Sequence, residues 1–242
     1  MIRKIILDGI PVEYRLERKN VKNLNLRIKS DMTVHVSVNR FVSQKTVDNF
    51  LMSKSDYIIG ALKRFEEKAK NIPGPLQYND GDIIEFLGEK KYLSLTQGKN
   101  SVSINEKYII LSVNDTDNEQ LKKRVLNNWY RQRCMEVIKG LCDKVYPDFE
   151  HYKVAYPQIK LRSMTARWGS CRPVSGVLTF NTALITVPVK CIEYVVYHEF
   201  THFLQPDHSK NFYLLLESFL PNWKERKTLL EQYGVNIKKY NI

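Results

Sequence analysis

The chain has 242 residues, 43% of them hydrophobic, and its 38 lysines and arginines against 26 aspartates and glutamates give a formal net charge of +12. This composition excludes intrinsic disorder for the chain as a whole, because there is enough apolar side chain to build a core. No apolar stretch approaches the roughly 20 residues of a membrane helix, and residues 1–7 are too short for a secretory signal. We therefore expect one large domain or two small ones in the cytoplasm, without a membrane partner.

Strand patterns dominate the first half of the chain. Apolar and polar residues alternate over 24–28 and 34–38, and Ser30-Asp31 between them predicts a hairpin turn. Further strands are predicted over 83–87, 91–95 and 108–113. No internal repeat is visible in the sequence.

Helices can be placed by their caps and apolar stripes. One helix is predicted to begin at the N-cap Ser43 and to end at residues 71–75 (NIPGP). The polar residues 114–118 precede a long amphipathic helix that runs to Val145. We therefore divide the chain into a strand-rich N-terminal subdomain, residues 1–115, and a second domain, residues 116–242, in an α+β fold.

The second domain is predicted to alternate strands and helices. Strands are expected over 154–161 and 177–180, followed by a helix that Pro188 opens. The last helical region covers 209–233, with a break near Pro221.

A metal-binding pattern lies on the helix after Pro188, where residues 198–202 are His-Glu-Phe-Thr-His. Residues four apart share one helix face, so His198 and His202 can bind one ion. Catalytic zinc takes three protein ligands and keeps one open position, and His208 follows a break at Pro206. A shuffled chain of this composition contains the five-residue pattern roughly once in 200. We predict His198, His202 and His208 as metal ligands.

Glu199, next to the first ligand, supplies the expected chemistry. Water bound to zinc ionises near neutral pH, and Glu199 is placed to accept its proton, so the pattern predicts metal-assisted hydrolysis with Glu199 as general base. Imidazole ligands also accept other divalent metals. For Asp207, capping of the following helix is favoured over a hydrogen bond to a ligand imidazole. His35 and His151 are interpreted as surface residues.

Arg167-Trp168-Gly169-Ser170-Cys171, together with Phe180-Asn181, Pro188 and residues 198–208, resembles the bacterial YgjP-like family of predicted zinc metallopeptidases, which are related to SprT-like zincins. The resemblance spans the chain and is most specific in its C-terminal third. It implies a zincin-like α+β fold with the three histidine ligands and the general base given above, and it implies no known substrate. The histidine spacing equals that of metzincins, but their turn glycine would fall at Gln205, so that family is excluded.

The segment 167–171 is the candidate substrate contact. In zincin-like folds a substrate strand pairs with a sheet edge above the metal, so we expect this segment beside the metal-binding helix, with Arg167 and Trp168 touching substrate. Arg162 and Arg172 could join Arg167 in binding a carboxylate, a phosphate or a developing oxyanion. The alternative is that Trp168 packs in the core and the arginines are solvated or paired with acids.

Cysteine chemistry is not favoured. The four cysteines lie 8, 29 and 20 residues apart, too far for a zinc knuckle or a redox motif, and we expect reduced, mostly buried thiols. A nucleophilic role for Cys171 would need a histidine partner that the sequence does not identify. The cysteines are Cys134, Cys142, Cys171 and Cys191.

Three functions remain open. The first is a zinc-dependent peptidase acting on a peptide or protein substrate. The second is a metal-dependent phosphoanhydride hydrolase of nucleoside triphosphates, since the same activated water and nearby arginines suit a phosphoryl centre. The third is a basic nucleic-acid-binding protein with a structural zinc, although the lysines and arginines cluster only at 122–124 and 131–133.

Overall fold

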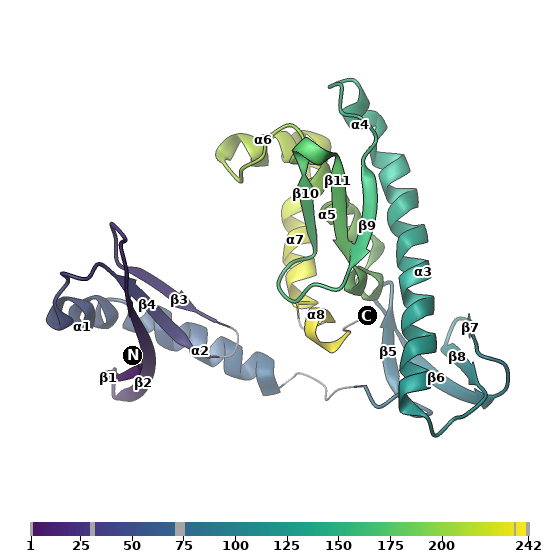
Figure 1. Cartoon of the computed structure of the whole chain (residues 1–242), viewed down its shortest axis with the longest axis horizontal. Coiled ribbons are helices and arrows are strands. Elements are labelled where there is room, and N and C mark those ends of the chain that lie inside the picture. The colour runs from purple at the N-terminus through teal and green to yellow at the C-terminus, as the bar shows by residue number, and fades with distance from the viewer. Residues whose placement is uncertain (1, 30–31, 71–75, 235, 241–242) are drawn as a thin grey trace. The chain divides into compact units, whose positions relative to one another are not determined.

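The computed structural model describes residues 2–29, 32–70, 76–234 and 236–240, and the chain separates into two units, Met1–Ile72 and Pro73–Ile242 (Figure 1). The division expected after residue 115 therefore moves to the segment around residue 72. The reason is that the strands between residues 83 and 113 share one apolar core with the helices that follow them. Each unit combines a sheet with helices, so the α+β expectation is confirmed. None of the helices in the described ranges is long and apolar enough to cross a membrane.

The N-terminal unit is a four-stranded sheet covered by two helices. Strand order is β1-β2-β4-β3, with β2 and β4 parallel and the other pairs antiparallel. Inward-facing side chains such as Tyr14 and Leu16 form a core that is separate from that of the second unit. The elements are β1 (Ile2–Leu7), β2 (Ile10–Arg18), β3 (Asn25–Ile28), β4 (Val34–Val38), α1 (Gln44–Met52) and α2 (Ser55–Lys70).

Two expectations for this unit need comment. The Ser43 side chain accepts a hydrogen bond from the Thr46 main-chain N–H, which confirms the predicted N-cap. The single predicted helix is instead two, because α1 ends at the C-cap Ser53 and α2 begins at Ser55. The predicted hairpin turn at Ser30-Asp31 and the helix end at 71–75 lie outside the described residues.

The second unit opens with a sheet of the same topology. Its order is β5-β6-β8-β7. The two central strands, β6 and β8, are again parallel, and the outer pairs are antiparallel. The strands are β5 (Ile83–Phe86), β6 (Glu89–Gln97), β7 (Ser101–Ile104) and β8 (Tyr108–Val113), of which β7 was not predicted.

The correspondence between the two sheets extends to single residues. Tyr14 pairs with Val34 in the first sheet as Leu93 pairs with Ile109 in the second. In each unit the last strand ends five residues before a side-chain N-cap, and a helix follows. The structure therefore contains a strand-and-helix repeat that the sequence does not reveal.

Helix α3 (Glu119–Val145) links the layers of the second unit. Its predicted start is confirmed, because Asn118 accepts a hydrogen bond from the Leu121 main-chain N–H. Its first part lies against the β5–β8 sheet and its later part lies beside β9 (Figure 1). The short helix α4 (Pro147–Glu150) follows directly.

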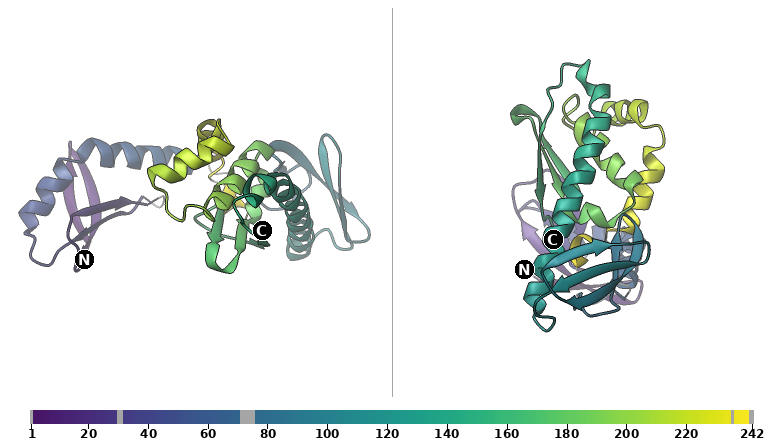
Figure 2. Two further views of the ribbon diagram at one scale, coloured as in Figure 1. Left: turned by 90° about the horizontal axis from the view of Figure 1, so that it is seen from above. Right: turned by 90° about the vertical axis from the view of Figure 1, so that its right-hand side faces the viewer.

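A three-stranded sheet, two 3-10 turns and four helices complete the described part of this unit. The sheet has the order β10-β11-β9, with β9 and β11 parallel and β10 antiparallel at one edge. Helix α5 lies between this sheet and the α6–α7 pair (Figure 2, right). The elements are β9 (Gln158–Arg162), β10 (Gly169–Arg172), β11 (Val177–Asn181), the 3-10 turns η1 (Pro173–Ser175) and η2 (Thr182–Thr186), and helices α5 (Val189–Thr201), α6 (Lys210–Phe219), α7 (Trp223–Gln232) and α8 (Asn236–Lys239).

The β5–β6 turn contacts the start of α5. The Leu87 main-chain N–H donates to the Ile185 carbonyl oxygen at 2.7 Å. Gly88 has φ of +85°, and a Cβ atom there would lie 2.5 Å from Cγ of Pro188, the N-cap of α5. Only glycine fits this position without displacement, so the hairpin turn fixes where α5 begins.

Candidate metal centre

Helix α5 presents the predicted metal-binding pattern at its C-terminal end. Its predicted apolar positions, such as Ile192 and Val196, are buried. This leaves His198 on the face toward the cavity, and His202 directly follows the last helical residue as the C-cap. His208 comes from the loop between α5 and α6.

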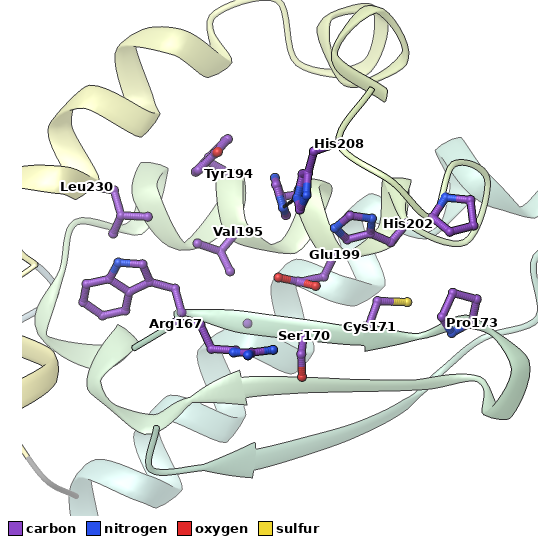
Figure 3. Close-up of a pocket in the computed structure, with 14 residues that line it drawn as sticks. Arg167, Ser170, Cys171, Pro173, Tyr194, Val195, Glu199, His202, His208 and Leu230 are labelled. Atoms are coloured by element: carbon purple, nitrogen blue, oxygen red, sulfur yellow. Dashed lines mark hydrogen bonds between the residues drawn. The ribbon is translucent and has the colours of Figure 1, made fainter. Parts of the chain in front are cut away.

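The structure brings these three imidazoles together (Figure 3). One nitrogen from each of His198, His202 and His208 lies within 4.8 Å of the others, so the three could hold one metal ion. Nε2 of His208 is 2.9 Å from Nε2 of His198. Phe212 of α6 packs against all three rings, with centroid distances of 4.9, 4.6 and 4.9 Å, and so restricts their orientation.

The protonation states of His198 and His202 suit a divalent metal. Burial lowers the pKa of His198 to about 3, and the neighbouring imidazoles act in the same direction. Burial also lowers the pKa of His202. Nδ1 of His202 lies 3.2 Å from the Gln205 carbonyl oxygen, an arrangement that holds the proton on Nδ1 and leaves the Nε2 lone pair for a metal. Three imidazoles with one side open to a cavity are the donor set of a catalytic zinc site.

Glu199 lies between α5 and the edge strand β10 (Figure 3). Only 5% of the residue is exposed, and this burial raises the pKa of its carboxyl to about 8, while the Arg167 guanidinium opposes the shift. A Cβ atom on Gly169 would lie 2.5 Å from Oε1 of Glu199. Glycine at the start of β10 therefore allows the strand to lie directly against the carboxylate.

All predicted site residues line one cavity of about 450 Å³. Trp168 is half-buried, packs against the core and also lines this cavity. The segment 167–171 lies beside α5 as expected, because β10 contacts that helix. The predicted residues on the cavity wall are Arg167, Trp168, His198, Glu199, His202 and His208.

Other candidates lie elsewhere. Asp207 accepts hydrogen bonds from the Gln205 side chain and the Ser209 main-chain N–H just before α6, in keeping with the capping interpretation. His35 lies on β4, and His151 lies in a turn, 3.3 Å from a main-chain oxygen. Neither belongs to the histidine cluster.

The cysteine expectation is confirmed, since all four are free and three of them are buried. The fourth, Cys171, is half-buried and lines the cavity. Burial, with the Glu199 charge acting in the same direction, raises the pKa of this thiol to about 12. A protonated thiol is a poor nucleophile, so Cys171 packs rather than reacts.

Sequence analysis did not assign roles to Gly169, Phe212 and Tyr194. Tyr194, one turn before His198 on α5, lines the cavity, and its ring centroid is 5.8 Å from that of His198. Its spacing from the first ligand could have suggested this position. The contacts of Gly169 and Phe212 depend on elements that meet only in the folded chain.

Comparison with known proteins identifies the family. No curated protein matches the sequence. Among solved structures, the metallopeptidase zymogen abylysin of Pyrococcus abyssi is similar over 39% of this chain and 92% of its own, with 18% sequence identity and a TM-score of 0.36. The family profile described as "YgjP-like, metallopeptidase domain" matches residues 22–233. This match covers most of both units, so the chain belongs to the YgjP-like metallopeptidase family and is a hydrolase.

Proposed function

We propose that this protein is a zinc-dependent peptidase in which His198, His202 and His208 hold the metal and Glu199 is the general base. The observation that carries the proposal is the convergence of three imidazoles beside the buried Glu199 side chain at the edge of a sheet. The family match supports a metallopeptidase and hence a divalent metal. Nucleotides and nucleic acids gain no support from that match.

The residues around the cavity divide the work of hydrolysis. A bound zinc ion supplies a Lewis acid that lowers the pKa of water and polarises the substrate carbonyl. Burial raises the pKa of Glu199 to about 8, so its carboxylate form is a stronger base than a solvated glutamate for taking a proton from the attacking water and returning it to the leaving amine. Arg167 places a guanidinium on the cavity wall, where it can stabilise negative charge that develops on the substrate.

Strand β10 offers the substrate a sheet edge. Among the described strands it pairs only with β11. The Asn181 main-chain N–H donates to the Trp168 carbonyl oxygen at 2.8 Å, so Trp168 faces β11. By the alternation of an antiparallel pair, the main-chain groups of Gly169 and Cys171 then point to the other edge. An extended peptide can pair there as an added strand, next to Glu199.

The test combines metal content with peptide hydrolysis. We expect about one zinc per chain in the wild type and in Glu199→Gln, and loss of zinc in His202→Ala. Peptide hydrolysis is expected to fall about 10²- to 10⁴-fold in Glu199→Gln, because the metal remains while proton transfer is lost.

His151→Ala is the matched control, since His151 is a histidine outside the cluster, and it should match the wild type in both measurements. Retention of zinc by His202→Ala, or full activity of Glu199→Gln, would contradict the proposal.

A further inference from the structure

The segment that contains β9, β10 and β11 has an unusual charge distribution. No aspartate or glutamate occurs between Glu150 and Glu193. Elsewhere the chain mixes both signs, so this acid-free stretch is a local feature of the sheet that borders the candidate metal centre. Its basic residues are Lys153, Lys160, Arg162, Arg167, Arg172 and Lys190.

The three arginines of this stretch line one cavity of about 600 Å³, which we call the arginine pocket. Arg162 comes from the end of β9, Arg167 from the loop before β10 and Arg172 from the end of β10. All three are exposed, and none forms an ion pair with an acid in the part of the chain that the structure describes. The arginines are therefore solvated, as one half of the alternative expected, and they are available to a ligand.

The arginine pocket and the metal-site cavity share Arg167, Ser170 and Cys171 on their walls. Side chains alternate along β10, so Gly169 and Cys171 face α5. Ser170 and Arg172 face the opposite side of the sheet. Figure 3 shows the Cys171 side chain on the α5 side of the strand and Ser170 on the other. The edge strand thus separates the two cavities.

A peptide that pairs with β10 follows the same alternation. Its main chain lies beside Gly169 and Cys171, and every second side chain projects to the face of Ser170 and Arg172. The side chains between them project toward α5 and Glu199. Only the first set can reach the arginine pocket.

We propose that the arginine pocket selects carboxylate side chains, so that the substrates are extended peptides with aspartate or glutamate at alternate positions beside the cleaved bond. Guanidinium groups bind carboxylates through charge-assisted, often bidentate, hydrogen bonds. The preference should alternate along the peptide, because an acidic side chain moved by one position faces Glu199 instead of the arginines. This inference rests on the proposed peptidase function and names its substrate class.

The test uses zinc-loaded enzyme and a neutral host peptide that the wild type cleaves, acetylated and amidated so that no terminal charge remains. One aspartate is moved through the peptide position by position. We expect kcat/KM to rise about tenfold at alternate positions and to stay level or fall at the positions between them.

Variants of the pocket assign this preference to its arginines. Arg162→Gln and Arg172→Gln should each reduce the ratio of acidic to neutral turnover by about tenfold. Lys160→Gln is the matched control, because Lys160 is an exposed basic residue of β9 that does not line the pocket, and its ratio should equal that of the wild type. Arg172→Glu should shift the preference from aspartate to lysine at the same peptide position, a gain that misfolding does not produce.

Each other outcome has a definite meaning. Cleavage of peptides without an alternation in acid preference overturns this inference and leaves the peptidase proposal intact. A requirement for a free C-terminal carboxylate also overturns it, since the pocket would then bind the peptide's C-terminus and not its side chains. Turnover of nucleoside triphosphates without cleavage of any peptide overturns the proposed function and the selectivity with it.

Discussion

The two four-stranded sheets share one topology but differ in what surrounds them. In the N-terminal unit the β1–β2 turn at Asp8-Gly9 has open space around Gly9. In the second unit the corresponding turn at Leu87-Gly88 also has positive φ at both residues but lies against Pro188. The first sheet supports only its own small core, whereas the second positions the helix that carries the candidate ligands.

The edge strands show the same contrast. Ile6 of β1 is 70% exposed, and its counterpart in β5, by the register of the two hairpins, is Glu85. The Glu85 main chain accepts a hydrogen bond from the Tyr130 hydroxyl and donates one to the Tyr240 hydroxyl. The same sheet topology thus forms a separate unit at the N-terminus, whereas in the second unit it packs against the elements that carry the candidate metal centre.

Metal removal should distinguish the two units most strongly. A ligand that binds only the folded second unit stabilises it by about 4 kcal/mol when its concentration is 1,000 times its Kd, and it leaves the first core unaffected. We therefore expect chelation to lower the Tm of one of two calorimetric transitions. A single transition that moves as a whole would contradict the separation of the cores.

The turn glycines provide a matched pair for the next effect. Gly9→Ala introduces only left-handed backbone strain, which costs about 1–2 kcal/mol. Gly88→Ala adds a clash with Pro188 and should cost about 3 kcal/mol or more, and it should also weaken zinc binding. Equal losses of unfolding free energy in Gly9→Ala and Gly88→Ala, measured by denaturant titration, would show that the contact between the turn and α5 does not stabilise the second unit.

The repeat explains what could and could not be predicted. The cap Ser43 and the helix start after the polar residues 114–118 were predictable because N-capping depends on neighbouring residues alone. The repeat was hidden because equivalent buried positions carry different chemistry. Val12 is apolar, whereas its counterpart Lys91 buries its stem and donates to the Glu106 carbonyl oxygen at 2.5 Å.

The candidate site divides in the same way. The ligand pattern was predictable because helical spacing alone places His198 and His202 on one face. Gly169 was not, because its contact with Glu199 joins a strand and a helix that are distant in sequence. The order β10-β11-β9, which places Gly169 at an edge, depends on a crossover that local patterns do not specify.

The hydrogen bonds to Glu85 should give a smaller effect. Tyr130→Phe and Tyr240→Phe each remove one bond to its main chain and should each cost about 1–2 kcal/mol in the second transition. Ile6→Ala at the equivalent exposed position should change the first transition by less than about 0.5 kcal/mol. A larger loss in Ile6→Ala than in the tyrosine variants would contradict the difference between the two edge strands.

The smallest expected effect concerns the ion pairs of Glu193, which connect α5 to α3 and α7 and should make the stability of the second unit depend on pH. Burial acts to raise the pKa of Glu193, but hydrogen bonds from Lys144 of α3 and Arg226 of α7 outweigh it, so the pKa lies below its usual value of 4.5. A carboxylate with a lowered folded-state pKa contributes stability that is present above the usual value and is lost as pH falls through the lowered one. Glu193→Gln should therefore cost about 1 kcal/mol in the second transition at pH 7, and the difference from the wild type should vanish in acid. A cost that persists unchanged below the lowered pKa would mean that Glu193 acts by packing rather than by charge.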